Sequence, residues 1–533
     1  MLFLPIQKIK DLFLTMSTTI PTTATILGSL IQRGIKFSNR LALLRDDDAA
    51  SLQHDTLRRL LLSAEHTAFG AHYRFDKLLR YNDVSAAFAD NVPTHDYDKM
   101  YDEWWHRAVA QEPDVCWPGT VHYFALSSGT SGAPSKYIPV TDAMTRSMQK
   151  AGRKMFFSLT RYPLPMSAFT KGMMMVGGSA SLNVENGFYS GDLSGINANK
   201  IPYWLRRYYK PGVEIASIPD WNERIERIAH NAHNWDIGFL TGIPSWIQLM
   251  LERVIAYQKA DTIHDIWPNV SVYVSGGIAL EPYKQGMRRL FSRDIVYIDS
   301  YLASEGFIAF QNRPDSEQHA MAMVLNNGIY FEFVPFDDHN FDNEGNLKPN
   351  HQTLTIRQVQ LGKDYALLLT TCAGAWRYLI GDTVRFSDLE RCEIHITGRT
   401  KHFLSITGEH LSVDNMNRAM QLTAADFGVA VREFTVSAVE YAPGHFEHRW
   451  YVGCEPSVDK ILFQDRLDNY LKAINDDYRT ERGAFLRIKL EVLPTAYFYE
   501  FQRLHAKFDG QAKFPRVMKD DRFALWESFL RSK

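Results

Sequence analysis

The chain has 533 residues, of which 45% are hydrophobic and 13% aromatic, and its 59 basic and 61 acidic residues leave a net charge of −2. A chain with this many apolar residues can bury a large core, which excludes disordered, collagen-like and low-complexity proteins. The balanced charge, without a basic stripe, argues against nucleic acid as the main partner. The four cysteines are far apart and form no CxxC pair, so we expect a cytoplasmic protein without a disulfide scaffold or a zinc ribbon.

The chain begins with the apolar stretch MLFLPIQKIKDLFLTM, which Lys8, Lys10 and Asp11 interrupt. No basic region precedes it, so we expect a short amphipathic helix here rather than a signal peptide. Met16 is an alternative start of the chain. No stretch approaches 18 consecutive apolar residues, and no membrane span is predicted.

Helices and buried strands follow one another along most of the chain. The spacing of apolar residues predicts helices over 40–110 and over 221–232. Apolar runs at 173–176 and 272–274 end in glycines, which predicts strands buried on both faces. The stretch 328–386 is rich in strand formers, and we predict strands in its segments GIYFEFVP, TLTIRQV and YALLLTT.

The pattern changes after about residue 400. Alternating apolar residues predict one-sided strands at 434–436 and 488–492, and the spacing over 463–474 predicts a helix. Together they indicate a compact α+β module. His445 and His448 in the sequence HFEH lack further metal ligands nearby and are interpreted as part of a surface loop.

The segment SSGTSGAPSK, residues 127–136, lies between a predicted strand at 123–126 and a predicted helix from Thr141. Glycines permit close backbone approach, hydroxyls add donors, and Lys136 adds positive charge, which is how a loop binds a polyphosphate. The spacing does not fit a Walker A loop. An ordinary Ser/Gly turn is the alternative.

A carboxylate follows the apolar strand predicted at 295–298, in the segment DSYLASEG, residues 299–306. Glu305 at a strand end can hold Mg²⁺, while the ring of Tyr301 can pack on a base. Glu305 can instead cap a helix.

The segment WRYLIGDTVR, residues 376–385, places Gly381 and Asp382 between two strand-like runs. An aspartate there can accept hydrogen bonds from two ribose hydroxyls, although a Gly-Asp hairpin turn is the alternative. Two basic segments follow, GRTK at 398–401 and GQAKFPR at 510–516, whose lysines on their own are typical of a solvated surface.

The order of these segments is more informative than any one of them. A Ser/Thr/Gly loop, Tyr-x-x-Ser-Glu, Tyr-x-x-Gly-Asp, Gly-Arg-x-Lys and a late lysine follow one another as in the adenylate-forming superfamily. The chain most resembles the auxin-responsive Gretchen Hagen family of acyl-acid amido synthetases, including its bacterial members. Further stretches similar to that family are TAFG at 67–70, YIPVT at 137–141 and GIPSW at 242–246.

Two positions depart from the pattern of that family. Ala303 stands where the family has the first serine of Tyr-x-Ser-Ser-Glu, and Leu379 stands where it usually has an arginine, with Arg377 two residues away. These departures concern the surroundings of the α-phosphate. They leave Glu305, Asp382 and the phosphate loop in place.

The resemblance implies a ligase that uses ATP and Mg²⁺ to adenylate a carboxylic acid and then transfers the acyl group to an amine, commonly an amino acid, with release of AMP. It implies that Lys513, Glu305 and Thr130 are catalytic and that Glu305 holds the metal. It implies a hinge at Lys401 and a nucleotide site formed by Ser127, Ser128, Gly129, Thr130, Gly276, Gly277, Tyr301, Ser304, Asp382 and Arg399.

The acyl pocket is expected from residues 155–250. The candidates are Phe156, Met173, Met174, Met175, Phe239 and Trp246, and the three that we name as site residues are Met174, Phe239 and Trp246. Such residues are also typical of an ordinary core. A pocket rich in methionine and aromatic rings would suit an apolar or aryl acid.

The implied fold is α/β, with a large N-terminal domain (1–398) of mixed β-sheets flanked by helices plus a β-barrel-like subdomain, and a small, mobile α+β lid domain (399–533). Coenzyme A or another thiol as the acceptor is an alternative outcome, and so is a degenerate nucleotide- or acyl-binding protein. The sequence identifies neither the acid nor the amine. It leaves the oligomeric state open, with a monomer favoured.

Overall fold

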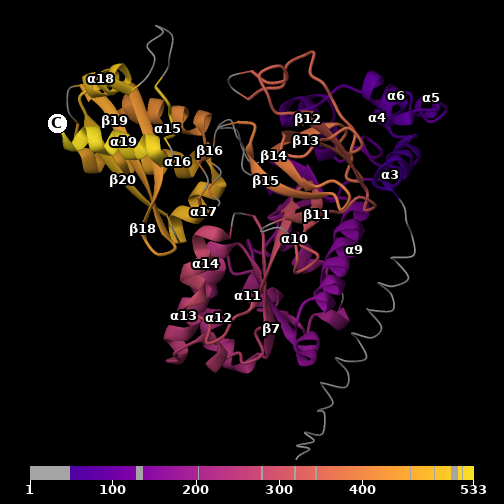
Figure 1. Ribbon diagram of the computed structural model, residues 1–533, viewed down its shortest axis with the longest axis horizontal. Coiled ribbons are helices and arrows are strands. Elements are labelled where there is room, and N and C mark those ends of the chain that lie inside the picture. Colours follow the sequence, from indigo (N-terminus) through magenta and orange to yellow (C-terminus); the bar gives the residue numbers. More distant parts are fainter. Residues whose placement is uncertain are drawn as a thin grey trace, which may run out of the picture.

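A computed structural model describes most of residues 48–533. The residues outside the described part are 1–47, 128–135, 202, 278–279, 317–319, 343–344, 402, 405, 408, 410, 456–457, 485, 506–513 and 519. The helix expected at the start of the chain therefore lies outside the described residues. Figure 1 shows a large part built around one long sheet and a smaller C-terminal part, orange to yellow, that lies beside it.

Short helices form the first described segment, as predicted for 40–110. They are α3 (Ala49–Ala64), α4 (Ala68–His72), α5 (Phe75–Leu78), α6 (Val84–Asn91), α7 (Tyr97–Met100) and α8 (His106–Val109). Side-chain caps start several of them, since Thr67, Asp83 and Asp96 each accept a hydrogen bond from a first-turn backbone N–H. Their apolar faces bury an aromatic cluster around Phe69 and Trp376.

One sheet of eleven strands organises the large part. Its strands in spatial order are β12 (Ile329–Pro335), β13 (Asp364–Thr371), β14 (Tyr378–Asp388), β15 (Glu393–Arg399), β11 (Met321–Met323), β10 (Gly306–Phe310), β9 (Val296–Ala303), β8 (Val272–Ser275), β7 (Ile237–Gly242), β3 (Gly172–Val176) and β6 (Tyr209–Lys210).

The half from β9 to β6 is parallel, and its central strands β7 and β8 are buried over most of their length. One face packs on helices α12 (Trp221–Asn231), α13 (Pro244–Gln258) and α14 (Glu281–Arg288), and the other on the segment that follows α9 (Asp142–Ser158). This double cover explains why the strands at 172–176 and 272–275 are continuous apolar runs, as predicted. The helix predicted at 221–232 is α12.

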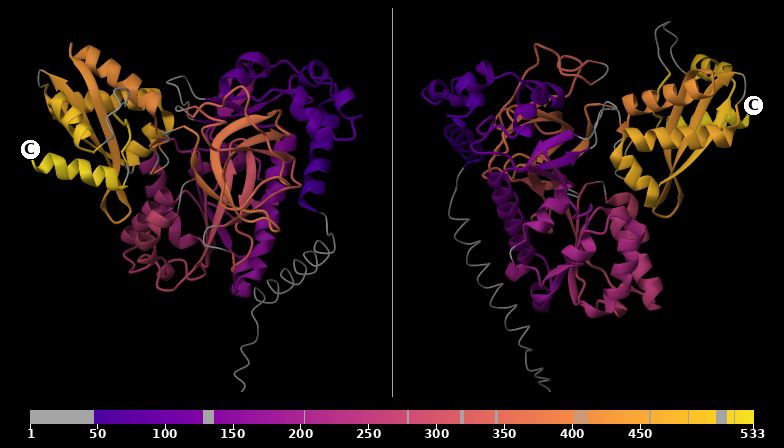
Figure 2. Two further views of the ribbon diagram at one scale, coloured as in Figure 1. Left: turned by 45° about the horizontal axis from the view of Figure 1, so that its top comes forward. Right: turned by 180° about the vertical axis from the view of Figure 1, so that it is seen from behind.

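The half from β9 to β12 is antiparallel and curls around its own apolar cluster, which contains Ile308, Phe331, Leu367 and Val384 from four different strands. The left view of Figure 2 shows this curl. The curl has the character of the expected barrel-like subdomain, but it is continuous with the parallel half of the same sheet. A separate sheet holds β2 (Lys136–Pro139), β1 (Tyr123–Ser127), β5 (Phe188–Gly191) and β4 (Asn183–Glu185), and α10 (Leu193–Asn199) and α11 (Val213–Ala216) follow it.

The C-terminal part is an α+β unit, as predicted. Its three-stranded sheet has the order β18 (Ala430–Ala442), β19 (His445–Glu455) and β20 (Leu486–Leu493). A short hairpin, β16 (Phe403–Leu404) and β17 (Leu411–Ser412), precedes it, and its helices are α15 (Val413–Asp426), α16 (Lys460–Ile474), α17 (Asp476–Ala484), α18 (Thr495–His505) and α19 (Asp520–Arg531). Within the described residues, no helix is long and apolar enough to cross a bilayer.

Two predictions of local structure are wrong. The segment 353–359 forms turns with a single bridge, Leu354 to Phe333, instead of a strand. His445 and His448 do not lie in a surface loop. They lie in β19, and His448 is fully buried, because its ring pairs with a buried carboxylate that is distant in sequence.

That carboxylate belongs to Glu409, which follows β16. Its oxygens accept hydrogen bonds from Nε2 of His448 at 2.8 Å and from the backbone N–H groups of Ile406 and Thr407. Burial alone would raise the pKa of Glu409, but the hydrogen bond and charge of His448 and the backbone donors outweigh burial and lower the pKa to about 2. The pair anchors the loop after β16 to the C-terminal sheet.

Glu409→Gln is expected to destabilise the protein by about 3 kcal/mol at neutral pH, since each pKa unit between an ordinary glutamate and this one corresponds to about 1.4 kcal/mol. A lowered pKa gives stability that is present above the ordinary pKa and is lost as the pH falls through the lowered one. The difference in unfolding free energy between wild type and variant should therefore shrink as the pH falls from 4.5 toward 2. Urea unfolding at several pH values measures it, and a constant difference would contradict this account.

Candidate active site

The carboxyl ends of the parallel strands form one edge, where ligands bind in α/β sheets. The strand register places Val176, Gly242, Ser275 and Asp299 side by side in one row across β3, β7, β8 and β9. The chain leaves β8 through Gly276 and Gly277. A Cβ atom at Gly276 would lie 2.9 Å from the Ser300 hydroxyl, which would have to shift, and Gly277 has a φ of +87°, which favours glycine.

Three polar side chains meet beside this edge. Tyr301 ends on the inner side of the curl, and its hydroxyl donates to Oδ2 of Asp382 at 2.5 Å. Nε of Arg399 lies 2.9 Å from Oδ1 of the same carboxylate. The strands β9 and β14 are not neighbours in the sheet, so it is the curl that brings Tyr301 to Asp382, whereas Arg399 is paired with Asp382 directly in the β14–β15 register.

The electrostatics of this group follow from its burial. Burial, and next the charge of Asp382, raise the pKa of the Tyr301 hydroxyl well above its usual value, so this hydroxyl stays a donor. Each oxygen of Asp382 has one lone pair engaged by Tyr301 or Arg399 and one left over. Asp382 can therefore accept two more hydrogen bonds, one on each oxygen.

Glu305 lies in the tight turn between β9 and β10, where Ala303 is paired with Gly306. Its side chain is buried, and burial raises the pKa of the Glu305 carboxyl, an effect that Asp382 increases and that Lys136 and Arg399 oppose. Burial likewise lowers the pKa of Lys136, with Glu305 as the strongest opposing charge. The charges of these two groups therefore act on each other's pKa, and in both groups the effect of burial is the larger.

Two tyrosines near Glu305 and Lys136, Tyr378 and Tyr97, were not assigned a role from the sequence. The pKa of Tyr378 is raised well above its usual value, first by burial and then by the charge of Glu305, which places its hydroxyl beside that carboxylate. The amine of Lys136 lies 5.0 Å from the centre of the Tyr97 ring. Tyr378 opens the Tyr-x-x-Gly-Asp segment, so the motif contained the signal, but its pattern alone did not show which way the ring points.

Arg377 does not take the place of the arginine that the family pattern has at position 379. Its guanidinium is buried on the other side of the strand, where Nη2 lies 3.0 Å from Glu332 and Nη1 donates to the carbonyl oxygens of Ala89 and Val92 at 2.7 Å. It holds the N-terminal helices on the sheet.

The remaining predicted residues divide into described and undescribed ones. Ser127 ends β1, paired with Lys136, and Ser304 is half-buried next to Glu305. Lys401 directly follows Thr400, whose backbone N–H donates to the carbonyl of Gly381 at 2.8 Å. Ser128, Gly129, Thr130 and Lys513 lie outside the described residues.

The three named candidates for the acyl pocket are not brought together. Met174 is paired with Leu240 in the sheet, so Met174 and Phe239 point to opposite faces and lie in different apolar clusters. The ring of Trp246 lies near the C-terminal part, and its Nε1–H donates to Oε1 of Glu481 in α17 at 2.8 Å. These residues cannot form one common wall.

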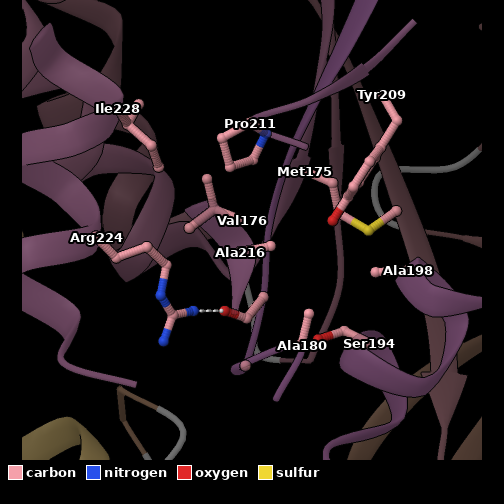
Figure 3. A pocket seen from close by; sticks show the side chains of 12 residues that line it. Met175, Val176, Ala180, Ser194, Ala198, Tyr209, Pro211, Ala216, Arg224 and Ile228 are labelled. Carbon is pink, nitrogen blue, oxygen red and sulfur yellow. Dashed lines mark hydrogen bonds between the residues drawn. The ribbon is translucent and has the colours of Figure 1, made fainter. Parts of the chain in front are cut away.

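A narrow cavity lies next to β3, between that strand and the helices α10, α11 and α12 (Figure 3). Its lining is mostly apolar, with Met175, Val176 and Ile228 among the contributors. Tyr209, Ser194 and Arg224 are the polar side chains on it. Met175, which is also a candidate for the acyl pocket, lines this cavity, whereas Met174 does not.

Solved structures of two ligases share this architecture. AtGH3.15 acyl acid amido synthetase in complex with 2,4-DB aligns over 93% of this chain and 96% of its own with a TM-score of 0.55 and 17% identity. 2-Hydroxyisobutyryl-CoA ligase in complex with 2-HIB-AMP and CoA aligns over 91% and 92% with a TM-score of 0.56 and 15% identity. At this level of identity, the likeness defines the fold, an α/β core with a C-terminal α+β unit.

The family follows from the sequence comparison. Residues 44–228, 322–399 and 414–522 match the N-terminal, central and C-terminal domains of the GH3 family, in that order. The chain belongs to the GH3 family, which is the Gretchen Hagen family that the motifs indicated.

Curated relatives include indole-3-acetic acid-amido synthetase GH3.4 of Arabidopsis thaliana, 28% identical over 203 residues, which are 35% of this chain and 32% of that one. Another is jasmonoyl-L-amino acid synthetase JAR4 of Nicotiana attenuata, 29% identical over 210 residues, 38% of this chain and 35% of that one. The matched region spans less than half the length of these curated relatives.

Proposed function

We propose that the protein is an ATP-dependent, AMP-forming ligase that adenylates a carboxylic acid and transfers the acyl group to an amine, an amino acid being the expected acceptor. The observation that carries the proposal is the Tyr301–Asp382–Arg399 group next to the buried Glu305, at the carboxyl edge of the sheet. Family membership supports the reaction class. The names of the relatives support an amide as the product.

The described residues fit ATP. Asp382 has two acceptor positions left, which match the two hydroxyls of a ribose. Gly276 and Gly277 leave the backbone free of side chains where the adenine would pack, with Tyr301 as the opposite wall. Arg399 is fixed on Asp382 and adds positive charge next to the phosphates. The phosphates would accept hydrogen bonds from Ser127, Ser128, Gly129 and Thr130. Ser304 would also belong to the phosphate site.

The described residues also fit Mg²⁺, in the form in which it accompanies a nucleotide. Mg²⁺ needs one or two carboxylates and takes its other ligands from phosphates and water. Glu305 offers a buried carboxylate whose charge is only partly compensated. Glu305 would be the carboxylate that holds Mg²⁺, with further oxygen ligands supplied by the nucleotide and by water. It would screen the charge of the phosphate oxygens.

The reaction would proceed in two steps. First, a carboxylate oxygen of the acid attacks the α-phosphorus of ATP, and the bond to the bridging oxygen breaks, so that pyrophosphate leaves with the electron pair. The amine nitrogen then attacks the acyl carbon, AMP leaves, and the nitrogen loses a proton. Both steps bring anions or developing negative charge together, and Lys136, Arg399 and Lys513 would stabilise it.

We further propose that residues 399–533 form a lid that turns on Lys401 relative to residues 1–398 between the two steps. Thr400 is tied to Gly381 in the large sheet, which makes Lys401 the first residue beyond a fixed point. The hydrogen bond between Trp246 and Glu481 and that between the Tyr283 hydroxyl and the carbonyl of Ile406 would hold one orientation of the lid. A closed lid would protect the mixed anhydride from water.

The four cysteines are free and buried, which supports a reducing cytoplasm as the location. Because Met174 and Phe239 lie on opposite faces, we assign the acyl pocket to only one of these faces, with Phe239, Phe156 and Met173 in contact there. Their apolar and aromatic character favours an apolar or aryl acid.

The products formed from ATP, an acid and competing acceptors test the proposed reaction. Purified protein is incubated with ATP, Mg²⁺ and a panel of aryl, indolyl and fatty acids, together with either the twenty amino acids or coenzyme A, and the products are identified by mass spectrometry. An N-acyl amino acid with stoichiometric AMP is expected. A thioester as the product would instead indicate a ligase with a thiol acceptor. ATP binding without any product would indicate a degenerate binding protein.

A further inference from the structure

The cavity beside β3 contains a buried positive charge. Arg224 extends from α12, and only 5% of its surface is exposed. In Figure 3 its guanidinium points to the carbonyl of Gly177, across the cavity from Tyr209. The enclosed space beside this charge, about 10 Å³, has room for about one water molecule, and it opens to solvent.

This charge is only weakly compensated within the protein. Nη1 donates to the carbonyl of Gly177 at 2.8 Å and Nε to that of Ile218 at 3.0 Å, and the guanidinium lies 5.4 Å from the centre of the Trp221 ring. No carboxylate of a described residue lies within 4.0 Å of it. Buried charges in proteins are normally paired. Burial accordingly lowers the pKa of Arg224.

The acidic groups that attract Arg224 accept hydrogen bonds from backbone N–H groups at helix starts. Asp192 caps α10, with Oδ1 accepting from the backbone N–H of Ser194 at 2.6 Å, and Asp220 caps α12 through the N–H of Glu223 at 2.7 Å. Both attract Arg224 at longer range. The Nη2 group makes no hydrogen bond to a described residue, so its N–H donors remain available to an acceptor such as a carboxylate oxygen.

The cavity belongs to the same sheet edge as the candidate active site. Gly177 follows Val176, which is in register with Gly242 and, one strand further, with Ser275. Two strand spacings, about 10 Å, therefore separate Gly177 from Gly276 in the nucleotide site. The Trp221 ring also contacts Trp246, the residue that donates a hydrogen bond to Glu481 of the C-terminal part, so the start of α12 lies beside the contact between the two parts.

We propose that Arg224 binds a carboxylate of one of the two organic substrates, in a subsite with apolar walls at Met175, Val176 and Ile228. The inference rests on the proposed ligase function and extends it to substrate recognition. Two sources have the required chemistry: the α-carboxylate of the acceptor amino acid, or a second carboxylate of the acyl acid, distant from the one that is adenylated. Either would pair a charge that the protein leaves without a carboxylate.

Arg224→Gln removes the charge and keeps a shorter polar side chain, and Arg227→Gln on the exposed side of the same helix is the matched control. Loss of a charge-assisted hydrogen bond weakens binding by about 10- to 100-fold. Two assays separate the sources: pyrophosphate exchange with the acid alone, and amide formation with an amino acid or its carboxamide as the acceptor.

If the acceptor binds Arg224, the variant raises the KM for the amino acid 10- to 100-fold and loses the preference over the carboxamide, while exchange is unchanged. If the acid binds there, the KM for the acid rises in the exchange assay and the acceptor preference is unchanged. Unaltered KM values for both substrates in a folded Arg224→Gln protein would overturn the inference. If that variant does not fold, the wild-type protein is compared on paired substrates. Equal use of an amino acid and its carboxamide, together with equal exchange for a diacid and its half-amide, would overturn the inference as well.

Failure of the proposed function itself has a different signature. Wild-type protein would then show neither exchange nor product with any substrate. The variant comparison is therefore interpreted only after wild-type exchange has been observed, and absence of that exchange would remove both proposals together.

Discussion

Replacing Asp382 with asparagine is expected to lower ATP–pyrophosphate exchange at subsaturating ATP by about two orders of magnitude. The carboxylate accepts from the Tyr301 hydroxyl at 2.5 Å and forms an ion pair with Nε of Arg399 at 2.9 Å, and the proposed ribose contacts use its two remaining acceptor positions. An amide has one acceptor oxygen and turns its NH₂ group toward a donor. Loss of one charge-assisted hydrogen bond to the ribose and weakening of the other, together about 3 kcal/mol, account for the size of the effect, which should appear in the KM for ATP.

Two further variants control this prediction. Tyr301→Phe removes one donor and leaves the carboxylate, so it should cost about tenfold, mainly through a less rigid Asp382. Asp364→Asn breaks the more exposed pair with Arg385 in the neighbouring strand and should leave the KM for ATP unchanged. An Asp382→Asn protein that binds ATP as tightly as the wild type would contradict the ribose assignment.

Glu305→Gln should reduce the rate of adenylation by about 100-fold or more. The two side chains have nearly the same shape, but glutamine offers a neutral ligand to a metal that prefers carboxylate oxygen. The variant also removes the anion that faces Lys136 and the Tyr378 hydroxyl. The rate constant of single-turnover adenylation, measured against Mg²⁺ concentration, is the direct measurement.

Glu393→Gln is the matched control. Glu393 is also buried, lies in β15 of the same sheet and pairs with Arg313, away from the proposed nucleotide site. This variant should lower the melting temperature without changing the Mg²⁺ dependence. An unchanged Mg²⁺ dependence in Glu305→Gln would assign Glu305 to a structural role instead.

The sequence predicted the local elements best where periodicity is strong. Helix α12 and the strands β3 and β8 were predicted because a strand covered on both faces must be apolar throughout, and a surface helix must be apolar on one side. The failures concern residues whose partners are distant in the chain. His448 resembles a polar loop residue in sequence and becomes a buried strand residue because Glu409, 39 positions earlier, pairs with it.

In the candidate site, too, local patterns predicted some residues, while contacts between distant segments determined the others. Asp382 and Arg399 could be proposed from the motif order, and neighbouring strands place them in register. Tyr301 approaches Asp382 only because the sheet curls, which no local pattern encodes. The acyl pocket was least predictable, since apolar side chains look alike in sequence, and strand alternation sent Met174 and Phe239 to opposite faces.

The central claim is adenylation of a carboxylic acid, and ATP–pyrophosphate exchange without any amine tests it most directly. The wild-type protein is assayed with Mg²⁺ across aryl, indolyl and fatty acids, with the Asp382→Asn variant as the blank. We predict exchange that depends on one class of acid and is nearly absent in the variant. Tight ATP binding without exchange for any acid, or exchange of equal size in the variant, would contradict the account.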